Sequence, residues 1–145
     1  MTFRPDCLVL HHSAGGGTLE ALAAKRFYHL CIEDAELDAG PRLLVSVPGD
    51  RASTYATGGY NSRAVAICVL GNFEFRQPSP LLLPYLVQVF AARLKHYQIH
   101  PDRIFTHGYV GKVLVAPNNR YVTACCGKNL APLVPLLRQA VRRYL

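Results

Sequence analysis

Two histidines and one cysteine, far apart in the sequence, have the chemistry of a metal site. His11 lies near the end of the apolar run CLVLHH, and His107 ends the short run RIFTH. Cys125 lies in the segment TACCG. Two imidazoles and a thiolate that leave a fourth position open are typical of catalytic zinc, because zinc accepts both ligand types in a tetrahedron. The open position would hold a water molecule, whose pKa the metal lowers. The spacing alone also fits packed histidines and a buried thiol.

Two of these candidates are each followed by a residue whose side chain can also bind a metal. His12 follows His11, but successive side chains of a strand point to opposite faces of the sheet, so one of the pair must turn away. We expect His12 to be the packed one. Cys126 follows Cys125, and either Cys126 or His12 could be a fourth ligand, which would close the site as in structural zinc sites. We expect no disulfide framework, because the 5 cysteines are odd in number.

Alternating strand and helix patterns must position these residues. Apolar and β-branched runs predict strands at 7–12, 27–33, 42–47, 64–71 and 103–107. Helices are predicted over 19–26 behind the capping residue Thr18, after Ser79 and Pro80, and from about Asn129. The run 64–71 is almost wholly apolar, which is typical of a central strand buried on both faces. We therefore predict a single α/β (α+β) layered domain over residues 1–145, with helices flanking a central, mixed, mostly buried β-sheet.

The composition limits the possible partners. The 145 residues include 16 Lys and Arg against 9 Asp and Glu, a net charge of +7, which favours anionic partners such as nucleic acid, lipid or cell wall. The basic residues are scattered and form no basic motif, so we expect no nucleic-acid partner. No apolar run approaches the roughly 20 residues of a membrane span. We expect a monomer. We also expect the protein to be made in the cytoplasm, since the N-terminus has no signal-peptide core.

Several segments carry a family resemblance. Five segments occur in an order that spans nearly the whole chain: LVLHHSAGG, YHLCI, GGYNSRAVAICVLGNFE, HPDRIFTH and TACCGKNL. Together they resemble the zinc-dependent N-acetylmuramoyl-L-alanine amidases, which include phage amidase-type lysozymes and peptidoglycan recognition proteins. The resemblance implies the fold of that family. It also implies hydrolysis of the amide between N-acetylmuramic acid and L-alanine in peptidoglycan.

The resemblance also implies roles for individual residues. His11, His107 and Cys125 match the zinc ligands of the family. Tyr28 matches a tyrosine beside the metal, and Thr123 matches a position next to the reacting carbonyl, which is held by Thr or Lys in different members. The loop around Tyr60 and Asn61 would form a wall of the substrate groove. There Tyr60 could stack on a sugar ring, and Asn61 could bind the peptide or only order the loop.

The sequence departs from the family pattern at several points. Cys126 stands where members often have Pro, and the segment after His107 lacks an Asp that is common there. Ala56 stands nearest to a loop position where some members carry a His, and Cys68 stands where one branch carries a catalytic Glu. Residues 112–121 look like an insertion, which could form a small hairpin.

Two different functions fit these features. We expect a phage or prophage endolysin that is released to the cell wall through a pore formed by another protein. Some recognition proteins of the family bind muropeptide without cutting it, typically after losing a zinc ligand. Here all three ligand positions are filled, which favours the hydrolase over the non-hydrolytic peptidoglycan-binding module.

Overall fold

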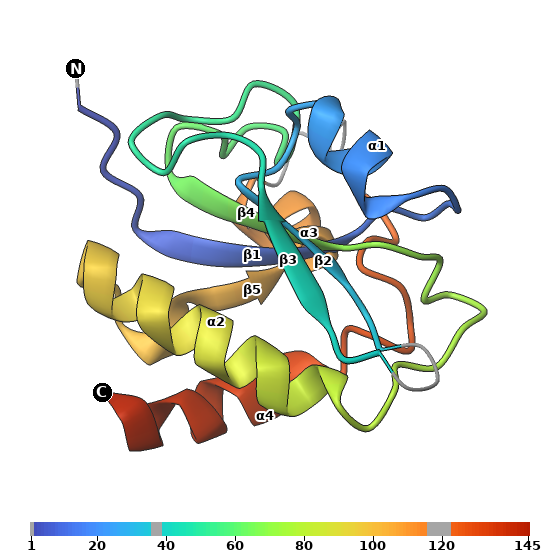
Figure 1. Ribbon diagram of the computed structural model, residues 1–145. Helices are drawn as coiled ribbons and strands as arrows, with labels where there is room; N and C mark the ends of the chain where they lie inside the picture. Colours follow the sequence, from blue (N-terminus) through green and yellow to red (C-terminus); the bar gives the residue numbers. More distant parts are fainter. Residues whose placement is uncertain (1, 36–38, 116–122) are drawn as a thin grey trace.

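The strands form a mixed sheet that runs through the middle of the molecule (Figure 1). The computed structural model describes residues 2–35, 39–115 and 123–145. The strands are β1 (Cys7–His12), β2 (Leu30–Glu33), β3 (Arg42–Val45), β4 (Ala64–Val69) and β5 (Ile104–Thr106). Their order in the sheet is β3-β2-β4-β1-β5, and only the β2–β3 pairing is antiparallel. The predicted mixed sheet is confirmed.

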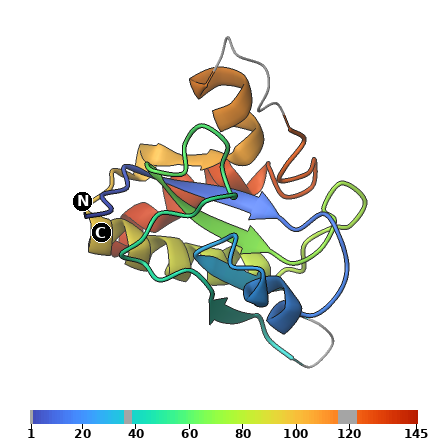
Figure 2. The same cartoon turned by 90° about the horizontal axis from the view of Figure 1, so that it is seen from above.

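Two of the three inner strands, β4 and β1, are buried along their whole length. Figure 2 shows them side by side and parallel, as the register of Cys7 with Ala64 and of His11 with Cys68 requires. A strand that is covered on both faces is mostly apolar, which explains the continuous runs CLVL and AVAICV. The two buried histidines that end β1 are the exception. The sequence pattern therefore located the centre of the sheet correctly.

Helices cover both faces of the sheet (Figure 1). Helix α1 (Leu19–Ala24) lies on one face, while α2 (Leu82–Tyr97) and α4 (Leu133–Ala140) lie on the other. The remaining helical turns are η1 (Pro101–Arg103), α3 (His107–Tyr109), η2 (Val110–Leu114) and η3 (Val141–Tyr144). Among the described residues, none of the helices combines the length and the apolar character needed to cross a bilayer.

The alternation of side chains along β1 divides the core into two parts. Leu8 and Leu10 pack in the larger cluster with α2 and α4, whereas Cys7 and Val9 pack in a smaller cluster on the opposite face. By this alternation His11 shares the face of Cys7 and Val9. The pleat of the strand therefore assigns His11 to the face that carries α1 and α3.

Several element boundaries differ from the predicted ones. Strand β2 begins at Leu30 and not at residue 27. Strand β5 ends before His107, because the Thr106 hydroxyl accepts a hydrogen bond from the Tyr109 N–H and caps α3. Helix α2 begins at Leu82, later than predicted, and the Ser79 hydroxyl donates a hydrogen bond to the buried carboxylate of Asp34. The predicted insertion at 112–121 begins inside the π-helical turn η2 and not in a strand, and its residues 116–121 lie outside the described residues.

Candidate metal centre

The structure brings the three predicted ligands together. One possible ligand atom from each of His11, His107 and Cys125 lies within 4.8 Å of the other two. The imidazole rings of His11 and His107 are 4.6 Å apart between centroids, and Sγ of Cys125 is 3.8 Å from Nδ1 of His11. These residues come from β1, from the start of α3 and from the turn before α4. Three segments that are distant in sequence therefore converge on one point.

A buried threonine fixes the orientation of the His11 ring. Nε2 of His11 lies 3.1 Å from Oγ1 of Thr57, and both side chains are fully buried. A proton on Nε2 would be donated to this hydroxyl, which leaves the lone pair on Nδ1 facing Cys125. Metal-bound histidines usually donate their other N–H in this way. Nothing in the sequence distinguishes Thr57 from the other hydroxyl residues of its loop, and sequence reasoning missed it.

A backbone N–H holds the sulfur of Cys125 in place. The N–H of His12 donates to this sulfur at 3.3 Å. Burial raises the pKa of the Cys125 thiol to about 12, and this hydrogen bond opposes the increase. The thiol is therefore protonated at neutral pH unless a cation lies next to it.

Glycine at position 108 lets two ligand segments approach each other. Gly108 follows His107, and its N–H donates to the carbonyl oxygen of Cys125 at 2.6 Å. A Cβ atom at Gly108 would lie 3.0 Å from the carbonyl oxygens of both Thr123 and Cys125. Any other residue would require the α3 segment or the turn that carries the sulfur to shift by a few tenths of an ångström.

Burial keeps both histidines neutral. It lowers the pKa of His107 to about 4 and that of His11 well below the usual range, with repulsion from His107 adding to the effect on His11. A neutral imidazole has a free lone pair, which is the form that binds a metal. The cluster therefore offers two ready nitrogen donors and one thiol that must lose a proton.

Tyr28 and Thr123, the two predicted catalytic residues, flank this cluster. The ring of Tyr28 lies 5.1 Å from the ring of His11. Burial raises the pKa of the Tyr28 phenol, and the neighbouring Cys68 adds a smaller increase. The phenol is thus protonated and able to donate a hydrogen bond. The hydroxyl of Thr123 accepts from the N–H of Cys125 at 3.2 Å, which leaves its own proton available to donate.

The two predicted substrate-binding residues take part in the structure of the loop. Tyr60 is only 8% exposed and packs against Arg63, whose guanidinium carbon lies 4.5 Å from the ring centroid. Asn61 accepts from the N–H of Thr57 at 2.7 Å and donates to the carbonyl of Thr54 at 3.0 Å. Asn61 therefore helps to position the threonine that orients His11. Substrate binding by Tyr60 and Asn61 stays a prediction.

His12 and Cys126, the residues that follow His11 and Cys125, make contacts outside the cluster. Nδ1 of His12 accepts the N–H of Phe73 at 3.0 Å, and Cys126 is buried in the main core cluster with the same phenylalanine. Within the described ranges, the group of possible metal ligands contains His11, His107 and Cys125 but neither His12 nor Cys126. This arrangement is that of a site with an open position.

A groove of about 550 Å³ borders the cluster on the side of Cys125 and Thr123. Lys112 and Lys128 line it together with one carboxylate, that of Glu74. The carboxylate accepts from the backbone N–H of Lys128 at 3.0 Å, so it ties the loop after β4 to the turn that follows Cys125. Cys125 therefore lines a space large enough for part of a ligand.

Comparisons with known proteins agree with this geometry. The family model described as N-acetylmuramoyl-L-alanine amidase matches residues 1–127. No curated protein matches the sequence. The fold is similar to that of the N-acetylmuramoyl-L-alanine amidase LysC from Clostridium intestinale URNW, with 19% identity, a TM-score of 0.71, and coverage of 97% of this chain and 87% of that chain.

Two further solved structures extend the likeness. The endolysin N-acetylmuramoyl-L-alanine amidase LysCS from the same organism has 21% identity, a TM-score of 0.65, and coverage of 88% of this chain and 78% of that chain. PGRP-SA from Apis mellifera has 14% identity, a TM-score of 0.68, and coverage of 92% and 84%. At these identities the structural likeness shows a shared fold.

Proposed function

This chain belongs to the N-acetylmuramoyl-L-alanine amidase family and is an amidase of peptidoglycan, and we propose that zinc held by His11, His107 and Cys125 serves its reaction. The substrate is the amide that joins the lactyl group of N-acetylmuramic acid to L-alanine. The observation that carries the proposal is the convergence of the three donor atoms within 4.8 Å of one another.

The donor set fits zinc. Ligands bound at the usual zinc distances in a tetrahedron lie about 3.5 Å apart. The separation of 3.8 Å between Sγ of Cys125 and Nδ1 of His11 is close to that value. Two imidazoles and one thiolate also match the ligand softness that zinc prefers. When bound, zinc would supply Lewis acidity at the amide carbonyl and a nucleophilic water at neutral pH.

The residues around the ligands would then act on the substrate. The protonated phenol of Tyr28 and the hydroxyl of Thr123 would donate hydrogen bonds to the oxygen on which negative charge develops during attack. Such donors typically contribute about 10²–10³ in rate each. A threonine hydroxyl carries no charge, so it stabilises an oxyanion less than a lysine would. We therefore expect a competent but slow amidase.

A structural zinc site and a non-hydrolytic binding module were the alternatives from sequence. A structural site would need a fourth protein ligand, and both His12 and Cys126 make other contacts. A binding-only module would be expected to lack a ligand, and here the described residues hold all three. Both observations support the hydrolase.

We further propose that the amidase lyses bacterial walls as a phage or prophage endolysin. A relative of the same fold from Clostridium intestinale is itself described as an endolysin. The net charge of +7 suits an anionic wall. Growth of cells that express the chain with and without a pore-forming partner tests this role, and lysis that needs no partner would contradict release through a pore.

The experiment for the chemistry combines metal content with product analysis. Purified protein should contain about one zinc per chain and release soluble peptides with a new N-terminal alanine from purified peptidoglycan. Zinc removal by a chelator should abolish release, and added zinc should restore it. Full hydrolysis by protein from which all metal has been removed would overturn the proposal.

A further inference from the structure

A second hollow, separate from the groove beside Cys125, combines cations with exposed aromatic rings. It has a volume of about 320 Å³, and its charged lining residues are Lys25, Arg26 and Arg51. Phe27 and Tyr55 also line it, with ring centroids 5.7 Å apart and exposures of 37% and 77%. The lining contains no carboxylate. Exposed aromatic faces beside three cations suit a ligand that carries negative charge and also has a carbon skeleton that can pack on the rings.

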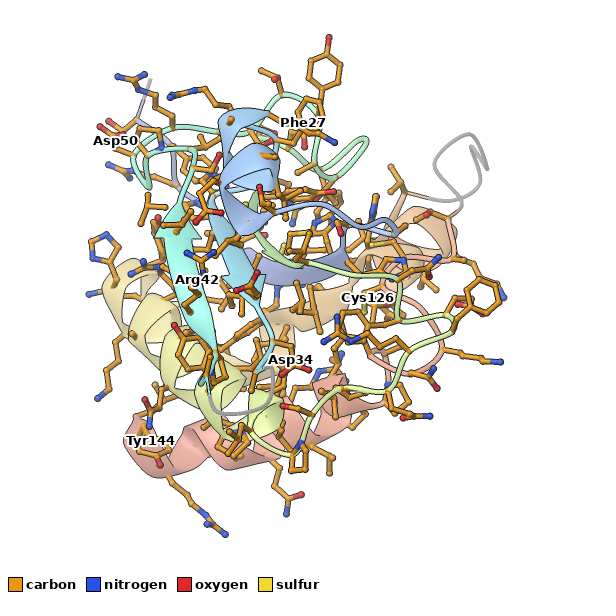
Figure 3. The ribbon with its side chains drawn as sticks, turned by 45° about the vertical axis from the view of Figure 1, so that its right-hand side comes forward. Phe27, Asp34, Arg42, Asp50, Cys126 and Tyr144 are labelled. Carbon is orange, nitrogen blue, oxygen red and sulfur yellow. The ribbon has the colours of Figure 1, made fainter. Side chains whose placement is uncertain are left out.

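A neighbouring hollow of about 490 Å³ shares Arg51 and Ala52 with the first. Arg4 adds another cation to its lining, and Asp50 is its single carboxylate. The two hollows are therefore adjacent, and we call the segment that lines both, residues 51–52, the ridge. In Figure 3, Phe27 and Asp50 lie toward the upper edge of the molecule, whereas Tyr144 lies at the lower edge.

Buried hydrogen bonds fix this ridge. Nε2 of His29, which is 1% exposed, lies 2.7 Å from the carbonyl oxygen of Arg51. The hydroxyl of Ser53, which is 2% exposed, donates to the carbonyl of Phe27 and accepts from the N–H of Tyr55 at 3.3 Å. The backbone on both sides of the hollows is therefore held from within, so the cations and rings project from a rigid base.

Among the described residues, the cations of this surface make few ion pairs within the protein. In the parts of the chain that the structure describes, the ion pairs include neither Arg4, Lys25 nor Arg26. Arg51 has only a distant carboxylate, that of Asp50 at 4.0 Å. By contrast, Arg42, Arg63 and Arg142 each pair closely with an acidic residue. The excess positive charge is thus available to an external anion.

We propose that these two hollows bind a phosphodiester-linked sugar or polyol polymer of the bacterial wall. Guanidinium groups match phosphate geometry with paired hydrogen bonds, and successive phosphates could occupy the hollows on either side of Arg51. The faces of Phe27 and Tyr55 suit the carbon skeleton between phosphates. A neutral glycan would explain the rings but leave the cations without a partner. The choice of a wall polymer over nucleic acid rests on the proposed function, which places the protein at peptidoglycan.

The position of the hollows connects them with the amidase site. The loop that begins at the ridge continues from Ser53 to Thr57, the residue that orients His11. A wall polymer held on the ridge would keep the enzyme on its substrate between cleavages. The hollows themselves contribute none of the three ligand positions, so binding and hydrolysis are separable.

The test uses the intact zinc-bound protein and soluble poly(glycerol phosphate), which contains no muramoyl amide and is not cleaved. Titration calorimetry should detect binding that weakens as salt is raised, as expected for charge neutralisation. The double variant K25Q/R26Q should lower the affinity by about 10- to 100-fold. The control R142Q/R143Q, which removes the same charge near Tyr144, should lower it by no more than about threefold.

Hydrolysis of a short soluble muropeptide by K25Q/R26Q should stay within about twofold of the unmodified protein, since neither residue belongs to the amidase site. Equal losses of polymer affinity in the two double variants would overturn the proposal, as would tighter binding of a single-stranded oligonucleotide. A large loss of muropeptide hydrolysis in K25Q/R26Q would also overturn it. A protein that binds the polymer but hydrolyses nothing would leave this inference standing and refute the amidase mechanism.

Discussion

Oγ1 of Thr57 lies 3.1 Å from Nε2 of His11, although 46 residues separate them in the sequence. Through this contact, the loop between β3 and β4 decides which nitrogen of the imidazole faces the other two ligands. Asn61 in turn holds the backbone of Thr57. The proposed metal centre therefore depends on two residues outside the set of three candidate ligands.

Replacing Thr57 by valine should weaken zinc binding about 10- to 100-fold, because the His11 ring loses its hydrogen-bond partner while the volume of the side chain is preserved. Competition with a chromophoric chelator measures the affinity. The variant Thr57→Ser keeps the hydroxyl and should bind zinc nearly as well as the unmodified protein. Equal zinc affinity in the valine and serine variants would contradict the orienting role.

The neighbouring cysteines should differ sharply in their effects. Cys125→Ser should reduce bound zinc well below one per chain and lower hydrolysis at least about 10³-fold, since a ligand is lost. Cys126→Ala should cost some stability, because the side chain is 1% exposed in the core, but should keep the zinc. Metal analysis measures the zinc bound per chain in both variants. Zinc loss in Cys126→Ala would indicate that Cys126 is a fourth protein ligand.

Thr123→Val should lower kcat by up to about 10²–10³-fold without changing zinc content, because the proposed hydrogen bond to the developing oxyanion is lost. Steady-state kinetics on a soluble muropeptide and metal analysis of the same sample provide the two readouts. If kcat of Thr123→Val equals that of the unmodified protein, Thr123 has no part in stabilising the oxyanion.

Gly108→Ala should destabilise the fold by about 1–3 kcal/mol and weaken zinc binding, because its Cβ would lie 3.0 Å from two carbonyl oxygens. Gly15→Ala is the matched control, since a Cβ there meets no atom within 4 Å. Urea unfolding compares the free energies of unfolding. Similar stability of the two variants would show that the close approach at Gly108 is easily relieved.

Stability should fall as the pH drops below about 6.5, partly through His29. Burial lowers the pKa of His29 in the folded protein, so unfolding takes up a proton in this range. Its stabilisation is complete above the unfolded-state pKa and is lost on acidification toward the folded-state pKa. His29→Gln should therefore show a shallower pH dependence in urea unfolding of the metal-free protein. The other histidines contribute equally to the pH dependence of both proteins. An unchanged slope of the free energy of unfolding against pH would therefore exclude a contribution from His29.

The sequence contained the information for the sheet and for the three candidate ligands that the structure brings together. The apolar runs of β1 and β4 indicated burial on both faces, and the extent of each run marked the position of the strand in the sequence. The pattern of two imidazoles and a thiol, with the family resemblance, selected His11, His107 and Cys125. Even the inward turn of His11 and the opposite orientation of His12 follow from the alternation along a strand, which is a local property.

Only the tertiary structure decided how these residues are held. The contacts of Thr57 with His11, of Gly108 with Cys125 and of Phe73 with His12 join segments that lie 17 to 61 residues apart. A hydroxyl in a polar loop or a glycine after a strand looks the same in sequence whether or not it touches a ligand. Such pairings arise when distant segments pack, and no local pattern of side chains records them.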